Sequence, residues 1–199
     1  MTAPATAIPG YRYGDPALAP SPLTPAELAE LEASLLFGPE DVAALKRAGA
    51  IVADRIEAIL DVWYGFVASQ PHLLAAFREH GTGEPIGAYL AAVRARFGQW
   101  ILDTCTAPHD AAWLAWQDEI GRRHHRSGKN RTDGVNAAPH IPLRHLLALV
   151  MPISLTMRPF LAETGATPAE VDAMHAAWTK AVLLQAILWA RPYVAAGDF

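Results

Sequence analysis

Apolar residues recur at helical spacing along most of the chain. Four stretches carry the pattern, at residues 52–67, 86–100, 143–161 and 171–188. Because positions three, four and seven apart share one face of an α-helix, each stretch predicts a helix with a buried side. No stretch alternates apolar and polar residues between hairpin turns, as a strand would. The sequence therefore predicts an all-α domain of seven or eight helices.

Prolines and capping residues mark where several helices begin. The tetrapeptide Thr-Pro-Ala-Glu occurs at residues 24–27 and again at 167–170. In each copy the threonine can cap the helix, the proline suits its first turn, and the glutamate can bond back to the cap. Three more prolines predict further starts: Pro39, Pro71 and Pro85. We expect Pro152 to kink the helix that contains it.

The helix predicted to start near Asp110 ends at two adjacent histidines. His124 continues an inward-facing apolar stripe made of Trp113, Trp116 and Ile120. His125 is turned by about 100° and shares its side of the helix with more polar residues. A neutral imidazole at the buried end of an aromatic stripe can ligate iron or zinc, because the apolar wall excludes water. The alternative is a histidine that only packs and hydrogen-bonds, which is the commoner role of an isolated helical histidine.

Composition predicts one soluble domain without a nucleic-acid partner. A chain of 199 residues with 52% hydrophobic residues can bury one substantial core. The net charge of -4 opposes binding to phosphate backbones. The basic run at 122–126 is short and lacks the aromatic residues that stack on bases. With Cys105 as the only cysteine, no intrachain disulfide can form, so we expect a reducing compartment, the cytoplasm.

We expect no association with a membrane. Residues 1–10 lack the basic start and apolar run of a secretory signal. Apolar stretches such as 181–190 are bounded by charges and are shorter than the ~20 residues that cross a bilayer.

Two segments are predicted to be irregular. Residues 1–23 are rich in proline, alanine and glycine, which excludes a long helix. They also contain Tyr11 and Tyr13, and since tyrosines usually cover a surface, we expect this arm to lie across the domain. The link from residue 126 to 141 is long, polar and directly follows the histidine pair, and long loops inside a domain are more often functional than idle.

Short motifs spread along the whole chain resemble those of the protoglobins, single-domain haem proteins related to the sensor domains of globin-coupled sensors. In chain order they are Ile8-Pro9-Gly10-Tyr11-x-Tyr13-Gly14, Trp63-Tyr64-Gly65, Tyr89-Leu90-x-x-Val93-Arg94-x-Arg96-Phe97, Trp100-Ile101-Leu102-Asp103-Thr104, Gly121-x-Arg123-His124-His125-Arg126, Pro139-His140-Ile141, Pro152-Ile153, Pro159-Phe160-Leu161 and Pro192-Tyr193. Because the series is colinear, it is more specific than any one motif.

The resemblance implies a globin fold, a three-over-three helical sandwich, with an extra N-terminal helix at about residues 25–36. One globin domain would span residues 24–199, preceded by the arm at 1–23. The resemblance also implies haem b as the cofactor and His124 as its proximal ligand, in agreement with the stripe described above. By the same resemblance, the arm and the loop from Arg126 would cover the haem edge and bury its propionates, so gas would reach the iron through tunnels between helices.

The distal side of the haem is assigned by the same resemblance. Trp63 and Tyr64 match the aromatic pair at the end of the second globin helix, and Phe97 matches the distal phenylalanine. The Tyr64 phenol could donate a hydrogen bond to iron-bound dioxygen. The alternative for Trp63 and Tyr64 is simple packing beside Leu60 and Val67.

One further haem-pocket position departs from the family pattern. Leu149 stands on the helix after the long loop, where protoglobins carry a large aromatic residue, and Met151 replaces a second aromatic two positions on. A leucine is smaller and more flexible there, so gas gating and haem distortion are not carried over from the family.

Other histidines carry weaker signals. Three fall in predicted links or helix starts and are expected to be exposed: His72, His80 and His109. His140 and His145 are candidates to approach the haem edge. Asp172 and His175 have the spacing of half a carboxylate-bridged di-iron motif, but the chain has no second copy, so a di-iron site is not supported.

The resemblance implies reversible binding of O2, CO or NO opposite His124, for sensing, storage or scavenging, with no catalytic residues. Histidine rather than thiolate ligation disfavours oxygen–oxygen bond cleavage as the main activity. The alternative is a haem enzyme that acts on NO, nitrite, peroxide or, if the protein has been adapted for it, diazo carbene donors. A third hypothesis is a haem-free helical interaction module, which would show no Soret band.

Assembly and signalling are the last expectations. The final helix has apolar residues on more than one face, and such a helix is either central or shared with a partner. The resemblance implies a homodimer through the last two long helices. Since no output domain is encoded, a sensor would need a separate partner.

Overall fold

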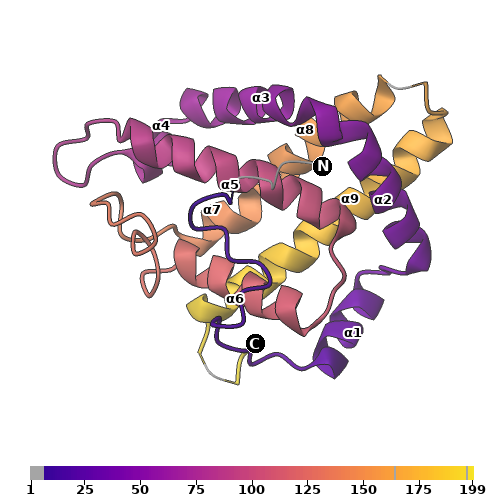
Figure 1. The fold of residues 1–199 in the computed structure, drawn as a ribbon, viewed down its shortest axis with the longest axis horizontal. Coiled ribbons are helices and arrows are strands. Elements are labelled where there is room, and N and C mark those ends of the chain that lie inside the picture. Colours follow the sequence, from indigo (N-terminus) through magenta and orange to yellow (C-terminus); the bar gives the residue numbers. More distant parts are fainter. Residues whose placement is uncertain (1–6, 164, 196) are drawn as a thin grey trace.

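The computed structural model describes residues 7–163, 165–195 and 197–199. These residues form nine α-helices: α1 (Pro25–Ser34), α2 (Pro39–Val52), α3 (Ile56–Ser69), α4 (Pro71–Leu74), α5 (Gly87–Thr106), α6 (Ala111–His124), α7 (Leu143–Ala148), α8 (Val150–Ala162) and α9 (Pro168–Ala190) (Figure 1). Three short 3-10 turns accompany them: η1 (Ala53–Arg55), η2 (Ala75–Phe77) and η3 (Arg191–Tyr193). The described chain has no strand, only two isolated bridges. The all-α prediction is confirmed, and the helix count exceeds it because α4 and α7 have only four and six residues.

Local capping chemistry explains most helix starts. Both Thr-Pro-Ala-Glu sequences form capping boxes, at α1 and α9. At α1 the hydroxyl of Thr24 accepts the backbone N–H of Glu27, and the Glu27 carboxylate accepts the N–H of Thr24. Helices α2 and α4 begin at their predicted prolines, whereas α5 begins at Gly87, two residues after Pro85.

Helix α9 runs through the middle of the molecule (Figure 1), where it packs against α8, α2, α6 and α5. Trp178 and Leu184, which belong to separate apolar clusters, are both fully enclosed. The helix is therefore apolar on several sides because the core of a single chain surrounds it. Of the two alternatives for this apolar helix, the structure shows the central position, and a shared surface stays a prediction.

The apolar segment before α9 is interrupted at Leu149, between α7 and α8. Pro152 has no N–H to offer the carbonyl group of Ala148, and its ring crowds that carbonyl, so the predicted disturbance occurs one turn before the proline. The segment Leu143–Ala162 is the one stretch of the described chain long and apolar enough to cross a membrane by length and composition. In the structure one side of it packs on the core, while Met151 on another side is exposed.

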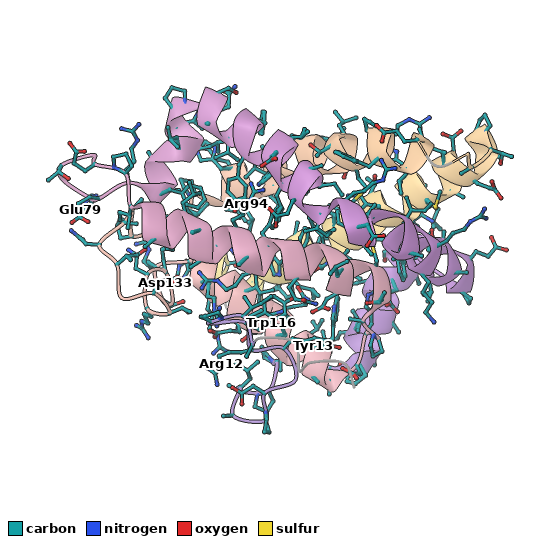
Figure 2. All side chains as sticks on the ribbon, turned by 45° about the horizontal axis from the view of Figure 1, so that its top comes forward. Arg12, Tyr13, Glu79, Arg94, Trp116 and Asp133 are labelled. Atoms are coloured by element: carbon teal, nitrogen blue, oxygen red, sulfur yellow. The ribbon has the colours of Figure 1, made fainter. Side chains whose placement is uncertain are left out.

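The described part of the arm, residues 7–23, lies against α5 and α6. The Arg123 guanidinium on α6 donates to the carbonyl oxygen of Gly10 at 2.7 Å, and Arg96 on α5 donates to that of Pro9 at 3.1 Å. Figure 2 shows Tyr13 of the arm on the same side of α5 as the α6 helix. These contacts hold the arm between two helices that are distant from it in sequence.

The link between α6 and α7 is irregular, as predicted, and it returns to its own starting point. The N–H of Ile141 donates to the carbonyl oxygen of His124 at 3.0 Å, so the intervening residues form a closed loop. This loop also meets the link between η2 and α5, where the N–H of His80 donates to the carbonyl oxygen of Asn136 at 2.7 Å. Both links lie at the left of Figure 1.

Candidate functional site

A cavity of about 220 Å³ lies between α5, α6, the α6–α7 loop and the arm. Its walls are mainly aromatic and aliphatic, and cationic side chains line part of it. The uncharged wall includes Phe77, Tyr89, Val93, Phe97, Ile120 and Trp189. An apolar cavity with a few convergent polar groups is the usual form of a cofactor site.

His124, the last residue of α6, borders this cavity. Its Nδ1 lies 2.9 Å from the carbonyl oxygen of Ile120, which can only accept, so Nδ1 carries the proton and Nε2 keeps its lone pair. No described residue hydrogen-bonds to Nε2. Burial lowers the pKa of His124, and the nearby charges of Lys129 and Arg123 act in the same direction, so the ring is neutral at pH 7. This neutral imidazole has one free nitrogen, as a metal ligand requires.

Trp189 of α9 fixes the plane of this imidazole. The two rings are stacked, with centroids 5.4 Å apart and 17° between their planes. The indole Nε1 of Trp189 donates to Oε1 of Gln117 on α6 at 2.8 Å. A Cβ at Gly121 would lie only 3.0 Å from the Cα of Trp189, so the glycine permits this close approach of α6 and α9. Sequence analysis missed this supporting residue, since α6 and α9 meet only in the folded chain.

Phe97 of α5 lines the cavity, whereas Trp63 and Tyr64 of α3 lie behind it. The ring centroids of Trp63 and Tyr64 are 5.6 Å and 6.4 Å from that of Phe97. The Tyr64 hydroxyl makes no hydrogen bond within the described chain, and burial raises its pKa, so the phenol stays protonated. The structure thus brings the three aromatic residues together, with only Phe97 facing the cavity.

Leu149 does not line the cavity. It forms the junction of α7 and α8 and is half-buried against the main core. Met151, the second departure from the family pattern, is 58% exposed.

Arg96 and Arg123 bring positive charge to the cavity, and each has an acidic partner. Arg96 forms a two-point ion pair with Asp133 of the loop, at 3.0 and 2.7 Å. Arg123 pairs with Glu119 at 2.8 Å and also lies over the Trp116 ring, 5.0 Å from its centroid. Figure 2 shows Asp133 in the loop and Trp116 on α6.

Lys129 of the loop is the cavity cation without an acidic partner at ion-pair distance in the described chain. It is only 8% exposed. Its Nζ donates to the hydroxyl of Tyr89 at 2.8 Å and to Oδ1 of Asn130 at 2.7 Å. Burial lowers the pKa of Lys129 to about 8. A buried ammonium held by neutral groups is suited to bind an anion.

The other histidines lie outside the cavity wall. His72 and His80 are exposed, as predicted, but the prediction for His109 is wrong. His109 is half-buried because its link folds back onto α1, where Nδ1 meets Glu32 at 2.6 Å and the ring stacks on Trp113 at 4.1 Å. Two others belong to separate ring pairs, His140 with His125 and His145 with His72. The described residues contain no group of three or more His, Cys, Asp or Glu side chains able to hold a metal ion.

A second, more open depression of about 460 Å³ lies between α1, α2 and the end of α5. It includes Cys105, whose pKa is raised by burial to about 12, so the thiol is protonated and unreactive. Its one histidine, His109, is engaged by Glu32. The cavity beside His124 is therefore the candidate ligand site.

The helical arrangement matches a known haem-protein fold. The structure is similar to the globin domain of the Geobacter sulfurreducens globin-coupled sensor, with a TM-score of 0.65 and 14% sequence identity, covering 84% of this chain and 97% of that chain. At this identity the similarity defines the fold, and the protein is a globin by fold. A search of curated proteins found no match.

The Protoglobin family model matches residues 24–199, and the chain belongs to the protoglobin family. Membership implies a globin that binds haem and gas molecules, as the motifs along the chain had indicated.

Proposed function

We propose that this protein binds haem b through His124 and reversibly binds a diatomic gas, O2, CO or NO, on the opposite side of the iron. The observation that carries the proposal is the His124 imidazole, which is neutral, tied through Nδ1 to Ile120, and free at Nε2 beside an aromatic cavity. Bound haem would supply an iron able to take a gas ligand, and His124 would hold it. Histidine ligation suits binding, storage, scavenging or sensing of such gases.

The residues around the cavity fit a haem group. Aromatic and aliphatic side chains such as Phe97 and Trp189 offer apolar contact to a porphyrin. Porphyrin propionates are anions, and Arg96, Arg123 and Lys129 are the cations available to them. Lys129 is the best placed of these in energetic terms, because its charge is buried and no carboxylate of the described residues lies at ion-pair distance, although the charge of Asp133 still favours its charged form.

The cavity volume implies a change of shape on haem binding. At about 220 Å³ it lies below the roughly 300–1,000 Å³ of typical ligand pockets. The α6–α7 loop forms one wall and is fastened at its base by the hydrogen bond from Ile141 to His124. We expect residues 126–140 to move outward when haem enters, while this base stays closed.

On the distal side, Phe97 is the residue placed to touch bound gas. Trp63 and Tyr64 support its ring from behind, so their proposed role is to shape the gas pocket.

Visible spectra of the ferrous protein test the haem assignment. We compare the parent, His124→Ala and, as a matched control, His125→Ala, each with and without CO. The parent and His125→Ala should show a Soret band that shifts with CO, whereas His124→Ala should lose haem or its five-coordinate ferrous spectrum. A parent without a Soret band, or a His124→Ala variant with an unchanged spectrum, would refute the proposal.

A homodimer belongs to the same proposal, with a face on α7 and α8. The side chains of Leu147, Met151 and Leu155 are 44%, 58% and 56% exposed. Met151 and Leu155 are four residues apart on α8 and so share one side of it, and Leu147 stands just before the junction at Leu149. A second copy of the chain is the proposed occupant of this apolar stripe, which shares only α8 with the last two long helices that the family resemblance implies.

A further inference from the structure

The phenol of Tyr11 lies at the cavity and donates its hydrogen bond to a carboxylate. Its hydroxyl oxygen is 2.8 Å from Oδ2 of Asp103 on α5. The other carboxylate oxygen, Oδ1, accepts a hydrogen bond from Nε2 of Gln99 at 2.9 Å, which holds Asp103 in place. Tyr11 is also one of the cavity-lining residues, and its ring meets that of Trp116 edge-on, with centroids 4.9 Å apart.

This pairing distinguishes Tyr11 from the other four tyrosines of the chain. Tyr89 also lines the cavity, but its oxygen accepts a hydrogen bond from the ammonium of Lys129, a cation that cannot take a phenolic proton. Tyr193 donates to a backbone carbonyl oxygen, which is a poor base. The remaining two make no hydrogen bond to a carboxylate within the described chain: Tyr13 and Tyr64.

A phenol next to a carboxylate has a specific redox property. Removal of one electron makes a phenol a strong acid, so oxidation is much easier when a base at hydrogen-bond distance takes the proton. Burial raises the pKa of Tyr11, and the negative charge of Asp103 raises it further. The phenol therefore keeps its proton until it is oxidised, and Asp103 is the group that receives it.

We propose that Tyr11 is a redox-active residue. When a hydroperoxide is the oxidant, Tyr11 supplies electrons to the haem cavity and passes its phenolic proton to Asp103. This inference rests on the proposed haem site. It adds a second activity, the reduction of hydroperoxides by small one-electron donors of the phenol or ascorbate class.

The reaction balances with these partners. The Tyr11 O–H bond would break, its proton would go to Oδ2 of Asp103, and its electron would serve the reduction of the hydroperoxide, for which bound haem would supply the redox chemistry. A donor molecule then returns one electron to the tyrosyl radical, and the proton moves back from Asp103. Two such cycles supply two electrons, and the two donor molecules release two protons. These electrons and protons convert an organic hydroperoxide to an alcohol and one water molecule, or hydrogen peroxide to two water molecules.

The position of Tyr11 also suits contact with such donors. It belongs to the arm at the protein surface, and its side chain is only half-buried. It thus borders the cavity on one side and lies near solvent on the other. Buried Trp116 on α6 contacts the same ring and is a neighbouring site to which the radical can move.

The test is rapid-freeze electron paramagnetic resonance of the full-length ferric holoprotein mixed with hydrogen peroxide. Protein grown with ring-deuterated tyrosine identifies a tyrosyl signal by its narrowed hyperfine structure. The variants are Tyr11→Phe, which keeps the contact with Trp116, and Asp103→Asn, which keeps a hydrogen-bond acceptor but removes the base. Tyr13→Phe is the matched control, because Tyr13 lies on the same arm and its hydroxyl makes no hydrogen bond to a carboxylate within the described chain.

The parent and Tyr13→Phe should give the same tyrosyl signal, Tyr11→Phe should lose it, and Asp103→Asn should lose most of it with haem content unchanged. A tyrosyl signal that persists in Tyr11→Phe, or its absence from the parent, would overturn the redox role. A parent without a Soret band would instead refute the haem site itself. If the Soret band changes with peroxide but the tyrosyl signal is the same in the parent and in Tyr11→Phe, the redox role alone is refuted.

Discussion

Replacement of Lys129 by methionine should stabilise the haem-free protein and weaken its binding of haem. In the fold, burial lowers the pKa of this lysine from 10.5 to about 8. The charged form is therefore disfavoured in the folded state, and the full penalty applies below pH 8. It fades as the pH rises from about 8 to 10.5, because the folded state then loses the proton while the unfolded state keeps it, and above 10.5 the lysine is neutral in both states.

The magnitude follows from the two pKa values. Their difference corresponds to about 3 kcal/mol of destabilisation at pH 7. Methionine also loses the hydrogen bonds to Tyr89 and Asn130, which together are worth about 1–2 kcal/mol. The net expectation is a gain of about 1–2 kcal/mol in the free energy of unfolding at pH 7. Above pH 10.5 only the loss of the two hydrogen bonds remains.

Urea unfolding of the haem-free protein at pH 7 and pH 10.5 measures this effect. Lys46→Met is the control, because Lys46 is an exposed lysine without an ion pair among the described residues. The reasoning fails if Lys129→Met is less stable than the parent at pH 7, or if its gain is as large at pH 10.5. A gain of equal size in Lys46→Met would show that the effect is not one of burial.

Haem binding should respond in the opposite direction. A charged hydrogen bond from Lys129 to a propionate, worth about 1.5–3 kcal/mol, would make the variant's affinity roughly tenfold or more lower. In the parent, affinity should fall as the pH rises above about 8, since the free protein then loses the proton that an anion needs. Lys129→Met should show no such fall, and an identical pH profile would contradict the assignment.

Three further substitutions test separate parts of the structure. Gly121→Ala puts a Cβ 3.0 Å from the Cα of Trp189, so it should separate α6 from α9 and lower haem affinity. The control Gly65→Ala, in open space on α3, should leave haem affinity unchanged. Equal haem affinities of the two variants would refute the close-packing argument. Tyr64→Phe should change the O2 dissociation rate, measured by stopped flow, by less than the ~5-fold expected for a lost 1 kcal/mol hydrogen bond, because Phe97 lines the cavity and Tyr64 does not. Met151→Glu places a charge in the exposed apolar stripe and should convert a dimer to monomers by light scattering; an unchanged dimer would exclude this face.

The features that were predicted from sequence depend on local interactions. Capping by Thr24, the proline starts and the helical period act within a few residues, so they can be recognised without the fold. The inward stripe that ends at His124 is also local, since it follows from the geometry of one helix. The resemblance to a family added the positions on other helices.

The features that were missed depend on contacts between distant segments. Trp189 lies on His124 only because α9 returns beside α6, and Lys129 is buried only because the loop closes against α5. His109 was expected in solvent, but it is enclosed because Glu32 and Trp113 meet around it. The sequence pattern also could not show that Phe97 covers Trp63 and Tyr64, because helical periodicity does not give the order of side chains between two helices.

Resonance Raman spectroscopy of the ferrous protein tests the ligation by His124 most directly. The parent should show an iron–histidine stretching band that shifts when the protein is labelled with 15N-histidine. His124→Gly should lack this band, and added free imidazole should restore an iron–imidazole band that no longer responds to the protein label. A 15N-sensitive band that persists in His124→Gly would show that another histidine holds the iron, and the site beside His124 would then be wrong.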